Sequence, residues 1–294
     1  MSGSFAIPDN LTEAIREPQK RLILVVGATD TGKTTLIEEL AITLAPRVNL
    51  GIVDLDMGQS HIGPPTTIGW ASVPKGFSGL SSLSEEHFYF TGTTTPTGSL
   101  LSAITGARLV VDRALRASEK VIIDTTGLVS EPAGRVLKQF KIDILRPDLV
   151  ICLERSGELS HIFEPYRYQS LEIFNIRPPL GVKTKTPSER AQYRYRKFQA
   201  YLKDSESREF YLDSLGIIFM SQKTQIDNAS LKNRIVSLRN KLNEDIALGI
   251  IENVRPRTGK IYIRTKALKD EPTTLVIGRA IIDRKERALK TGHF

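Results

Sequence analysis

The sequence contains the run Gly27-Ala-Thr-Asp-Thr-Gly-Lys33-Thr34, preceded by the apolar segment Leu22 to Val26 and followed by a helix-like stretch. A strand, a glycine-containing loop and a helix in this order form a phosphate-binding P-loop. Its backbone N–H groups curl around phosphates, its lysine reaches the β and γ oxygens, and the hydroxyl after the lysine sits on a magnesium ion. The helix N-terminus adds a partial positive charge. We therefore expect a site for a nucleoside triphosphate and Mg²⁺, formed by Gly27, Thr29, Asp30, Thr31, Gly32, Lys33, Thr34 and Thr35.

Further apolar runs read as strands and alternate with stretches that have the length and composition of helices. This alternation predicts a mainly parallel sheet flanked by helices, the α/β fold of P-loop NTPases. The expected helices cover residues 32–45, 98–117 and 131–145. The expected strands cover residues 22–26, 50–53, 88–90, 121–123, 149–153 and 216–220.

Two carboxylates follow the second apolar run in the sequence Val53-Asp54-Leu55-Asp56. Ligands of parallel sheets bind beyond the carboxyl ends of the strands, where Gly27, Asp54 and Asp124 all emerge. One aspartate is expected to hold a magnesium-bound water, and the other, or the same one, to accept a proton from an attacking hydroxyl. Turn capping is the alternative explanation for such a pair.

The rest of the chain suggests additional parts. Residues 1–20 are read as an N-terminal extension and residues 21–240 as the P-loop domain, with a polar, Arg-rich helical lid inserted at about 155–210. Residues 241–294 alternate apolar and polar residues around a turn, which predicts a small C-terminal β appendage.

The positive charge is concentrated in two segments. Residues 183–203 carry +6 and residues 255–294 carry +7, which leaves about −5 of the net charge of +8 for all the others. Two basic segments on a phosphate-handling protein favour a nucleic-acid partner, although solvated helix faces also explain charge runs. A single cysteine, Cys152, and the lack of a long apolar segment predict a cytoplasmic protein without a membrane partner.

The ordered series of motifs resembles the polynucleotide 5'-hydroxyl kinase family that includes the kinase subunit of the pre-mRNA cleavage factor and the pre-rRNA processing kinase. After the P-loop come Asp54-Leu-Asp-Met-Gly-Gln59 and Phe90-Thr-Gly-Thr-Thr-Thr-Pro96. Asp124-Thr-Thr-Gly127 and the segment Ser188 to Tyr201, similar to the family's arginine-rich lid, follow.

The resemblance implies transfer of the γ-phosphate of ATP to the 5'-hydroxyl of RNA or DNA. Lys33, Asp56, Arg190 and Arg194 are the catalytic residues it implies, with Thr34 and Asp56 near the metal and Asp54 a weaker metal candidate. The substrate-binding candidates are Gln59, Thr67, Thr94, Thr125 and Gly127. Leu128 stands where the family has a base-stacking Trp, so Tyr193 or Trp70 are considered as substitutes, with Trp70 equally a core candidate.

Other functions stay open at this point. Asp124-Thr-Thr-Gly127 also fits the γ-phosphate sensor of a regulatory GTPase, but a guanine-selecting Asn/Thr-Lys-x-Asp sequence is not found. An ATP-bound RNA-processing adaptor without kinase activity, or a kinase acting on a small molecule, is also compatible with the motifs. Protein partners cannot be inferred from the sequence.

Overall fold

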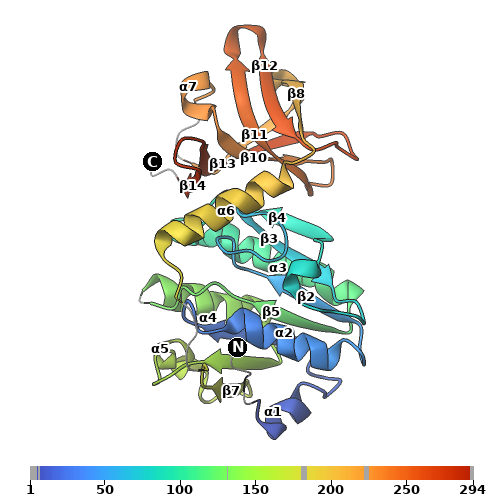
Figure 1. The fold of residues 1–294 in the computed structure, drawn as a ribbon, viewed down its shortest axis with the longest axis vertical. Coiled ribbons are helices and arrows are strands. Elements are labelled where there is room, and N and C mark those ends of the chain that lie inside the picture. Colours follow the sequence, from blue (N-terminus) through green and yellow to red (C-terminus); the bar gives the residue numbers. More distant parts are fainter. Residues whose placement is uncertain (1–4, 6, 131, 180–183, 222–224, 292–294) are drawn as a thin grey trace. The chain divides into compact units, whose positions relative to one another are not determined.

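The computed structural model describes residues 5, 7–130, 132–179, 184–221 and 225–291. The chain divides into two compact units: unit 1 comprises residues 1–63, 68–88 and 96–185, and unit 2 comprises residues 64–67, 89–95 and 186–294. Figure 1 shows the elements of both. Among the described residues, no helix combines the length and the apolar character that crossing a membrane requires.

The first sheet has seven strands in the order β4-β3-β2-β5-β1-β6-β7. Strands β2, β5, β1, β6 and β7 are parallel, and β3 pairs antiparallel with β2. The inner strands are buried along their whole length because helices cover both faces. The strands are β1 (Leu22–Gly27), β2 (Leu50–Asp54), β3 (Thr67–Ser72), β4 (His87–Phe90), β5 (Lys120–Asp124), β6 (Leu149–Leu153) and β7 (Glu172–Ile176).

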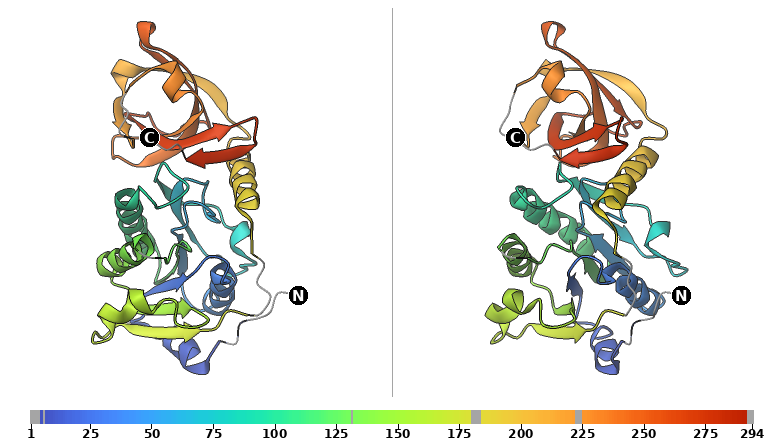
Figure 2. Two further views of the ribbon diagram at one scale, coloured as in Figure 1. Left: turned by 90° about the vertical axis from the view of Figure 1, so that its left-hand side faces the viewer. Right: turned by 60° about the vertical axis from the view of Figure 1, so that its left-hand side comes forward.

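Helices lie on both sides of this sheet, with α2 on one face and α3 and α4 on the other (Figure 2). Helix α2 contacts β1 and β5, whereas α3 contacts β2, β5 and α4. The helices of unit 1 are α1 (Asp9–Ala14), α2 (Lys33–Leu44), α3 (Leu100–Ala117), α4 (Ala133–Leu145) and α5 (Ser160–Phe163), with 3₁₀ turns η1 (Leu80–Ser82) and η2 (Glu164–Tyr166).

Unit 2 is built on a second sheet of mostly antiparallel strands in the order β14-β13-β10-β11-β12-β8, with β9 paired to β13 in parallel. Its strands are β8 (Glu206–Tyr211), β9 (Gly216–Phe219), β10 (Arg234–Arg239), β11 (Asp245–Arg255), β12 (Lys260–Thr265), β13 (Thr274–Asp283) and β14 (Ala288–Thr291). Its helices are α6 (Pro187–Tyr201) and α7 (Asn228–Leu231), with 3₁₀ turns η3 (Leu212–Ser214) and η4 (Pro256–Thr258).

The predicted α/β fold with a mainly parallel, helix-flanked sheet is confirmed, as is a further β structure toward the C-terminus. One predicted strand was assigned to the wrong sheet: residues 216–220 were expected to continue the nucleotide-binding sheet, but β9 pairs with β13 of unit 2. Its short apolar pattern indicates a strand but carries no information about its partner.

The division of the chain also differs from the predicted boundary at residue 240. The main segment of unit 2 begins at Thr186 and takes in the predicted lid helix, because α6 contacts β14. Within the segment 155–210, β7 extends the first sheet. This edge strand was missed because only Ile176 at its end is buried. Residues 180–183 of the predicted lid lie outside the described residues.

Candidate functional site

The loop between β1 and α2 has the backbone that a P-loop requires. Gly32 has φ of +86°, in the left-handed region, and Asp30 has φ of +56°. A Cβ atom on Gly27 would lie 2.7 Å from the Thr31 hydroxyl, which donates to the Ala28 carbonyl at 2.9 Å. The close contact explains the glycine at position 27, and the left-handed φ explains the glycine at position 32. No described side chain caps the N-terminus of α2, so its backbone N–H groups are oriented to receive an anion.

Lys33, the first residue of α2, is 8% exposed and its Nζ donates to the Ala28 carbonyl at 2.7 Å. The ammonium group is therefore held inside the loop. Burial lowers the pKa of Lys33, and the negative charges of Asp124, Asp56 and Asp30 partly oppose this. A lysine in this position carries its charge at the place where triphosphate oxygens bind.

Asp54 ends β2 and is buried, and its carboxylate organises the following turn. Its Oδ1 accepts the N–H of Asp56 at 2.8 Å, and its Oδ2 accepts the N–H groups of His61 at 2.5 Å and Ile62 at 3.1 Å. Burial raises the pKa of Asp54 even though these hydrogen bonds and His61 act in the opposite direction. Both oxygens are engaged with backbone, which favours a structural role over metal binding.

Asp56 is half-buried and has a different set of contacts. Its Oδ1 accepts the N–H groups of Gly58 at 3.0 Å and Gln59 at 2.9 Å. The negative charge of Asp56 acts to raise the pKa of Lys33, against the effect of burial. The turn fixes the carboxylate by one oxygen, and the other oxygen is available to a hydroxyl or a metal-bound water.

Asp124 ends β5, the strand between β1 and β2, and is 4% exposed. Its Oδ2 accepts from the Thr34 hydroxyl at 3.4 Å, while its Oδ1 has no hydrogen-bond partner among the described residues. Burial, then the charge of Asp54, raises the pKa of Asp124 to about 7, against the effect of Lys33. A buried carboxylate with one unsatisfied oxygen beside the P-loop hydroxyl fits the donor set of a magnesium site.

Sequence reasoning missed this role for Asp124, although an Asp directly after the buried run Val121 to Ile123 was a usable signal. Among the described residues there is no cluster of three or more His, Cys, Asp or Glu side chains suited to a metal. A phosphate-bound Mg²⁺ does not require such a cluster, because it takes one or two protein carboxylates and completes its shell with phosphates and water.

Two lysines of α4 are fully buried behind the carboxylates, and sequence reasoning missed them as well. Lys138 donates from Nζ to the Thr125 hydroxyl at 2.9 Å and to the Thr126 carbonyl at 2.5 Å. Lys141 Nζ has no hydrogen-bond partner within the described part of the chain. Burial lowers the pKa of Lys141 to about 8, against the charges of Asp56, Asp54 and Asp124. Both lysines lie on the buried face of α4. Sequence reasoning does not anticipate this, because lysines are rarely fully buried.

We expect Lys141→Met to raise the free energy of unfolding of the ligand-free protein by about 1–3 kcal/mol at pH 7, because a buried ammonium without a hydrogen bond is removed. A pKa lowered below that of the unfolded chain means that the wild type gains stability as pH rises from about 8 toward the usual lysine value. The advantage of the variant should therefore shrink at pH 9.5. Denaturant unfolding at both pH values measures the difference in unfolding free energy between the variant and wild type. The exposed Lys75→Met is the matched control. A Lys141→Met variant less stable than wild type at pH 7 would contradict the expectation.

The predicted substrate-binding residues fall into both units. In unit 1, a Cβ atom on Gly127 would lie 2.3 Å from the Thr29 hydroxyl. The turn after β5 therefore packs so closely against the P-loop that position 127 has no room for a side chain. The Thr125 hydroxyl donates to the Val25 carbonyl at 2.8 Å, and Gln59 Nε2 donates to the Gly58 carbonyl at 3.2 Å.

In unit 2, the Thr67 hydroxyl donates to the Pro64 carbonyl at 2.7 Å, and the Thr94 hydroxyl lies 2.9 Å from that of Thr291. The hydroxyls of Thr67 and Thr94 are thus engaged in hydrogen bonds within unit 2. Trp70, considered as a base-stacking side chain, is 4% exposed on β3 and is a core residue.

Arg190 and Arg194 lie on α6, which begins at a capping box formed by Thr186 and Glu189. The i, i+4 spacing places both arginines on one face of this helix of unit 2. The P-loop belongs to unit 1. A contact between these arginines and a nucleotide remains a prediction.

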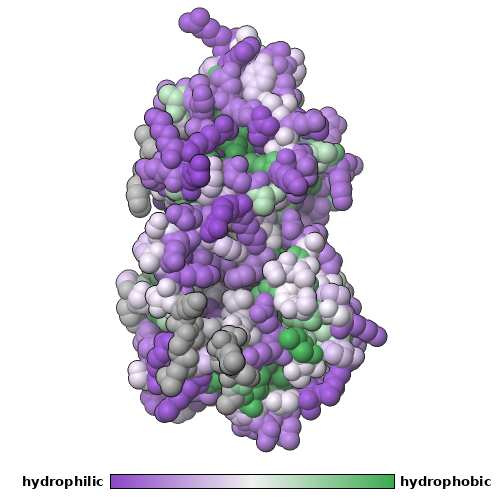
Figure 3. Space-filling view, in the orientation of Figure 1, coloured by the Kyte–Doolittle hydropathy of each residue, from purple (hydrophilic) through white to green (hydrophobic). Residues whose placement is uncertain are grey.

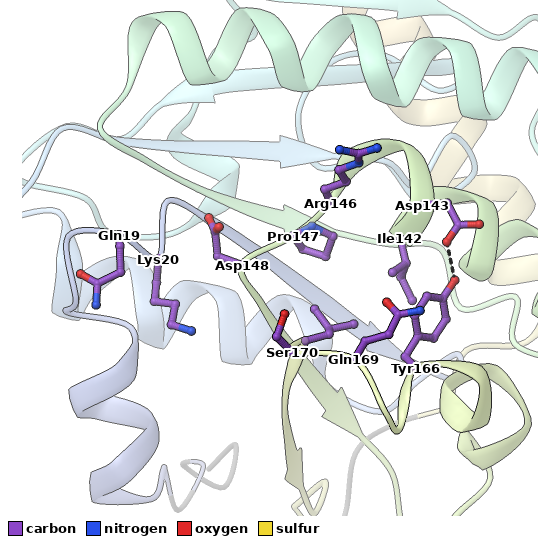
Figure 4. A pocket seen from close by; sticks show the side chains of 11 residues that line it. Gln19, Lys20, Ile142, Asp143, Arg146, Pro147, Asp148, Tyr166, Gln169 and Ser170 are labelled. Atoms are coloured by element: carbon purple, nitrogen blue, oxygen red, sulfur yellow. Dashed lines mark hydrogen bonds between the residues drawn. The ribbon is translucent and has the colours of Figure 1, made fainter.

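A cavity of about 630 Å³ in unit 1 lies away from the P-loop, at the amino ends of β1 and β6 (Figure 4). Its polar groups are largely paired with one another or with neighbours. Tyr166 donates to Asp143 at 2.8 Å, Asp148 accepts the Leu22 N–H at 2.8 Å, and Lys20 forms an ion pair with Glu172 at 2.6 Å. These contacts give the cavity walls a structural role.

Comparisons with known proteins agree with this site. Residues 27–204 match the family described as mRNA cleavage and polyadenylation factor CLP1 P-loop. A polyribonucleotide 5'-hydroxyl-kinase of Methanocaldococcus jannaschii is 37% identical over 208 residues, which cover 68% of this chain and 56% of that protein. One from Pyrococcus abyssi is 36% identical over 230 residues, which cover 76% of this chain and 63% of that protein. The chain thus spans somewhat more than half the length of these relatives.

A chain of the solved wild-type Clp1p–Pcf11p (454–563) complex has a similar fold, with a TM-score of 0.68 over 92% of this chain and 77% of that one at 13% identity. The family match covers the P-loop, both aspartate motifs and α6. The chain therefore belongs to the CLP1 P-loop family.

Proposed function

We propose that the chain is an ATP-dependent polynucleotide 5'-hydroxyl kinase that acts on RNA. The supporting observation is a P-loop whose Thr34 hydroxyl donates to Asp124, together with Asp56, which keeps one oxygen available and whose charge acts on Lys33, in a chain similar to proteins named polyribonucleotide 5'-hydroxyl-kinases. One carboxylate can serve the metal and the other the acceptor hydroxyl, which is the division of labour that phosphoryl transfer needs.

The nucleotide phosphates would be held by the backbone of residues 27–34 and by Lys33. Thr34 and Asp124 would hold Mg²⁺, which neutralises developing charge on the β and γ oxygens. This assignment moves the proposed metal contact from Asp56 to Asp124, because Asp124 is the carboxylate within reach of the Thr34 hydroxyl. Arg190 and Arg194 would add positive charge at the transferred group, as arginines do in other phosphoryl-transfer enzymes.

Asp56 would orient the 5'-hydroxyl and accept its proton. We expect Asp56→Asn to lower kcat by roughly 10²–10⁴-fold, because an amide keeps the size of the side chain but is a poor proton acceptor. Its carboxylate Oδ1 contacts can be retained by the amide oxygen, so the Kd for ATP should stay close to that of the wild type. Single-turnover transfer and equilibrium ATP binding measure the two quantities. Full turnover in Asp56→Asn would remove this role.

Acceptor specificity tests the proposed function. The purified chain is incubated with ATP and oligonucleotides of one sequence that carry either a 5'-hydroxyl or a 5'-phosphate, as RNA and as DNA, and GTP is the rival donor. We expect phosphate transfer only to 5'-hydroxyl ends, with RNA as an acceptor. Hydrolysis of GTP without transfer to any end would instead favour a switch protein.

A further inference from the structure

Unit 2 contains an open groove of about 610 Å³ between α6 and the turn that joins β13 to β14. Four of its lining residues come from α6 and two from the turn. They are Gln192, Tyr195, Arg196, Gln199, Glu286 and Arg287. The α6 residues recur at helical spacing and therefore share one face. Hydrophilic side chains cover the part of α6 that faces the viewer in Figure 3.

The charge of the groove is positive. Its one acidic lining residue, Glu286, is outnumbered by two arginines and is paired at 2.6 Å with Lys290, which also pairs with Asp283. Arg196 and Arg287 are exposed and form no ion pair with any described residue. Two guanidinium groups therefore face solvent from opposite walls, one on α6 and one on the turn.

The other side chains of the groove suit a single-stranded nucleic acid. Tyr195 is half-buried and offers an aromatic face, and the amides of Gln192 and Gln199 provide donors and acceptors. Arginines that bind phosphates next to an aromatic ring on which a base stacks are the usual combination in single-strand sites.

We propose that this groove binds the sugar–phosphate backbone of the polynucleotide downstream of the 5' end that is phosphorylated. The inference rests on the proposed function and extends it to a second contact region. Helix α6 carries Arg190 and Arg194 on one face and Gln192, Tyr195, Arg196 and Gln199 on the opposite face, so the two sets are separated by the diameter of the helix with its side chains, about 10–12 Å. A dinucleotide is too short to use both sets, whereas a longer strand can occupy both.

Kinetics on a short and on a long substrate distinguish RNA binding by the groove from a role in the phosphate transfer itself. The variant Arg196→Ala/Arg287→Ala is compared with wild type on a 5'-hydroxyl dinucleotide and on RNA of roughly 20 nucleotides. We expect KM for the long RNA to rise roughly tenfold, with kcat and the dinucleotide kinetics unchanged, since two phosphate contacts are lost. The slope of log KM for the long RNA against log salt should become shallower by about 1.4. The variant Lys241→Ala/Arg257→Ala removes two exposed charges elsewhere in unit 2 and should match wild type.

Several results would overturn the proposal. An equal loss on both substrates would place the arginines in the chemistry or the fold, and no loss on the long RNA would exclude the groove from RNA binding. Fluorescence anisotropy with labelled RNA gives a readout that does not depend on transfer. If wild type binds RNA without phosphorylating it, the proposed function fails, and weaker binding by the groove variant would still support the groove. If groove and control variants bind RNA as wild type does, the groove proposal fails, and an acidic protein surface becomes the better candidate.

Discussion

Lys33→Ala is expected to reduce phosphate transfer by at least roughly 10³-fold at saturating ATP, because it removes the charge that the P-loop places against the β and γ oxygens. Lys33 is buried in the loop and, among the described residues, its side chain hydrogen-bonds to the Ala28 carbonyl alone, so the variant should keep its fold. Rates measured under single-turnover conditions, together with circular dichroism, test both statements.

The matched control is Lys75→Ala, which removes an exposed lysine from the same unit and should leave the rate unchanged. Wild-type turnover in Lys33→Ala would contradict the assigned role of the loop. Loss of transfer accompanied by loss of secondary structure would instead indicate that Lys33 supports the fold.

Asp124→Asn is expected to have the second large effect, a fall in kcat of roughly 10²–10³-fold together with a higher Mg²⁺ concentration for half-maximal rate. The ligand-free variant should also be more stable than wild type at pH 8. The pKa of Asp124 is raised to about 7, so the folded state favours the protonated form. The resulting stabilisation is present at low pH and is lost as pH rises through 7. An amide, which cannot ionise, avoids that loss.

Thermal unfolding without nucleotide at pH 5 and pH 8, and magnesium titrations of the rate, measure these effects. The stability advantage of Asp124→Asn should be small at pH 5 and larger at pH 8. Glu13→Gln, which changes an exposed carboxylate in the same way, should show neither effect. An unchanged magnesium requirement in Asp124→Asn would return the metal site to Asp56.

The local features of the fold and of the P-loop could be predicted from sequence. The strand before Gly27 and the helix after Gly32 lie where the apolar run and the loop motif place them. Both features depend on residues close together in the chain, so periodicity and turn chemistry are sufficient to identify them.

Features that depend on distant residues were not predictable. β9 resembles any short apolar strand, and its pairing with β13 joins residues far apart in sequence. The distinction between Asp54 and Asp56 depends on which carboxylate receives the backbone N–H groups of His61 and Ile62. Lysines are rarely fully buried, and only the folded chain shows that Lys138 and Lys141 are.

The most direct test of the kinase proposal follows the γ-phosphate itself. ATP labelled on its γ-phosphate is mixed with a 5'-hydroxyl RNA and the chain, and the RNA is then digested to locate the label. The proposal predicts label on the 5'-terminal nucleotide with wild type and its loss with Lys33→Ala. Label that remains in ATP or appears only as free phosphate, while the protein is folded and binds ATP, would contradict it.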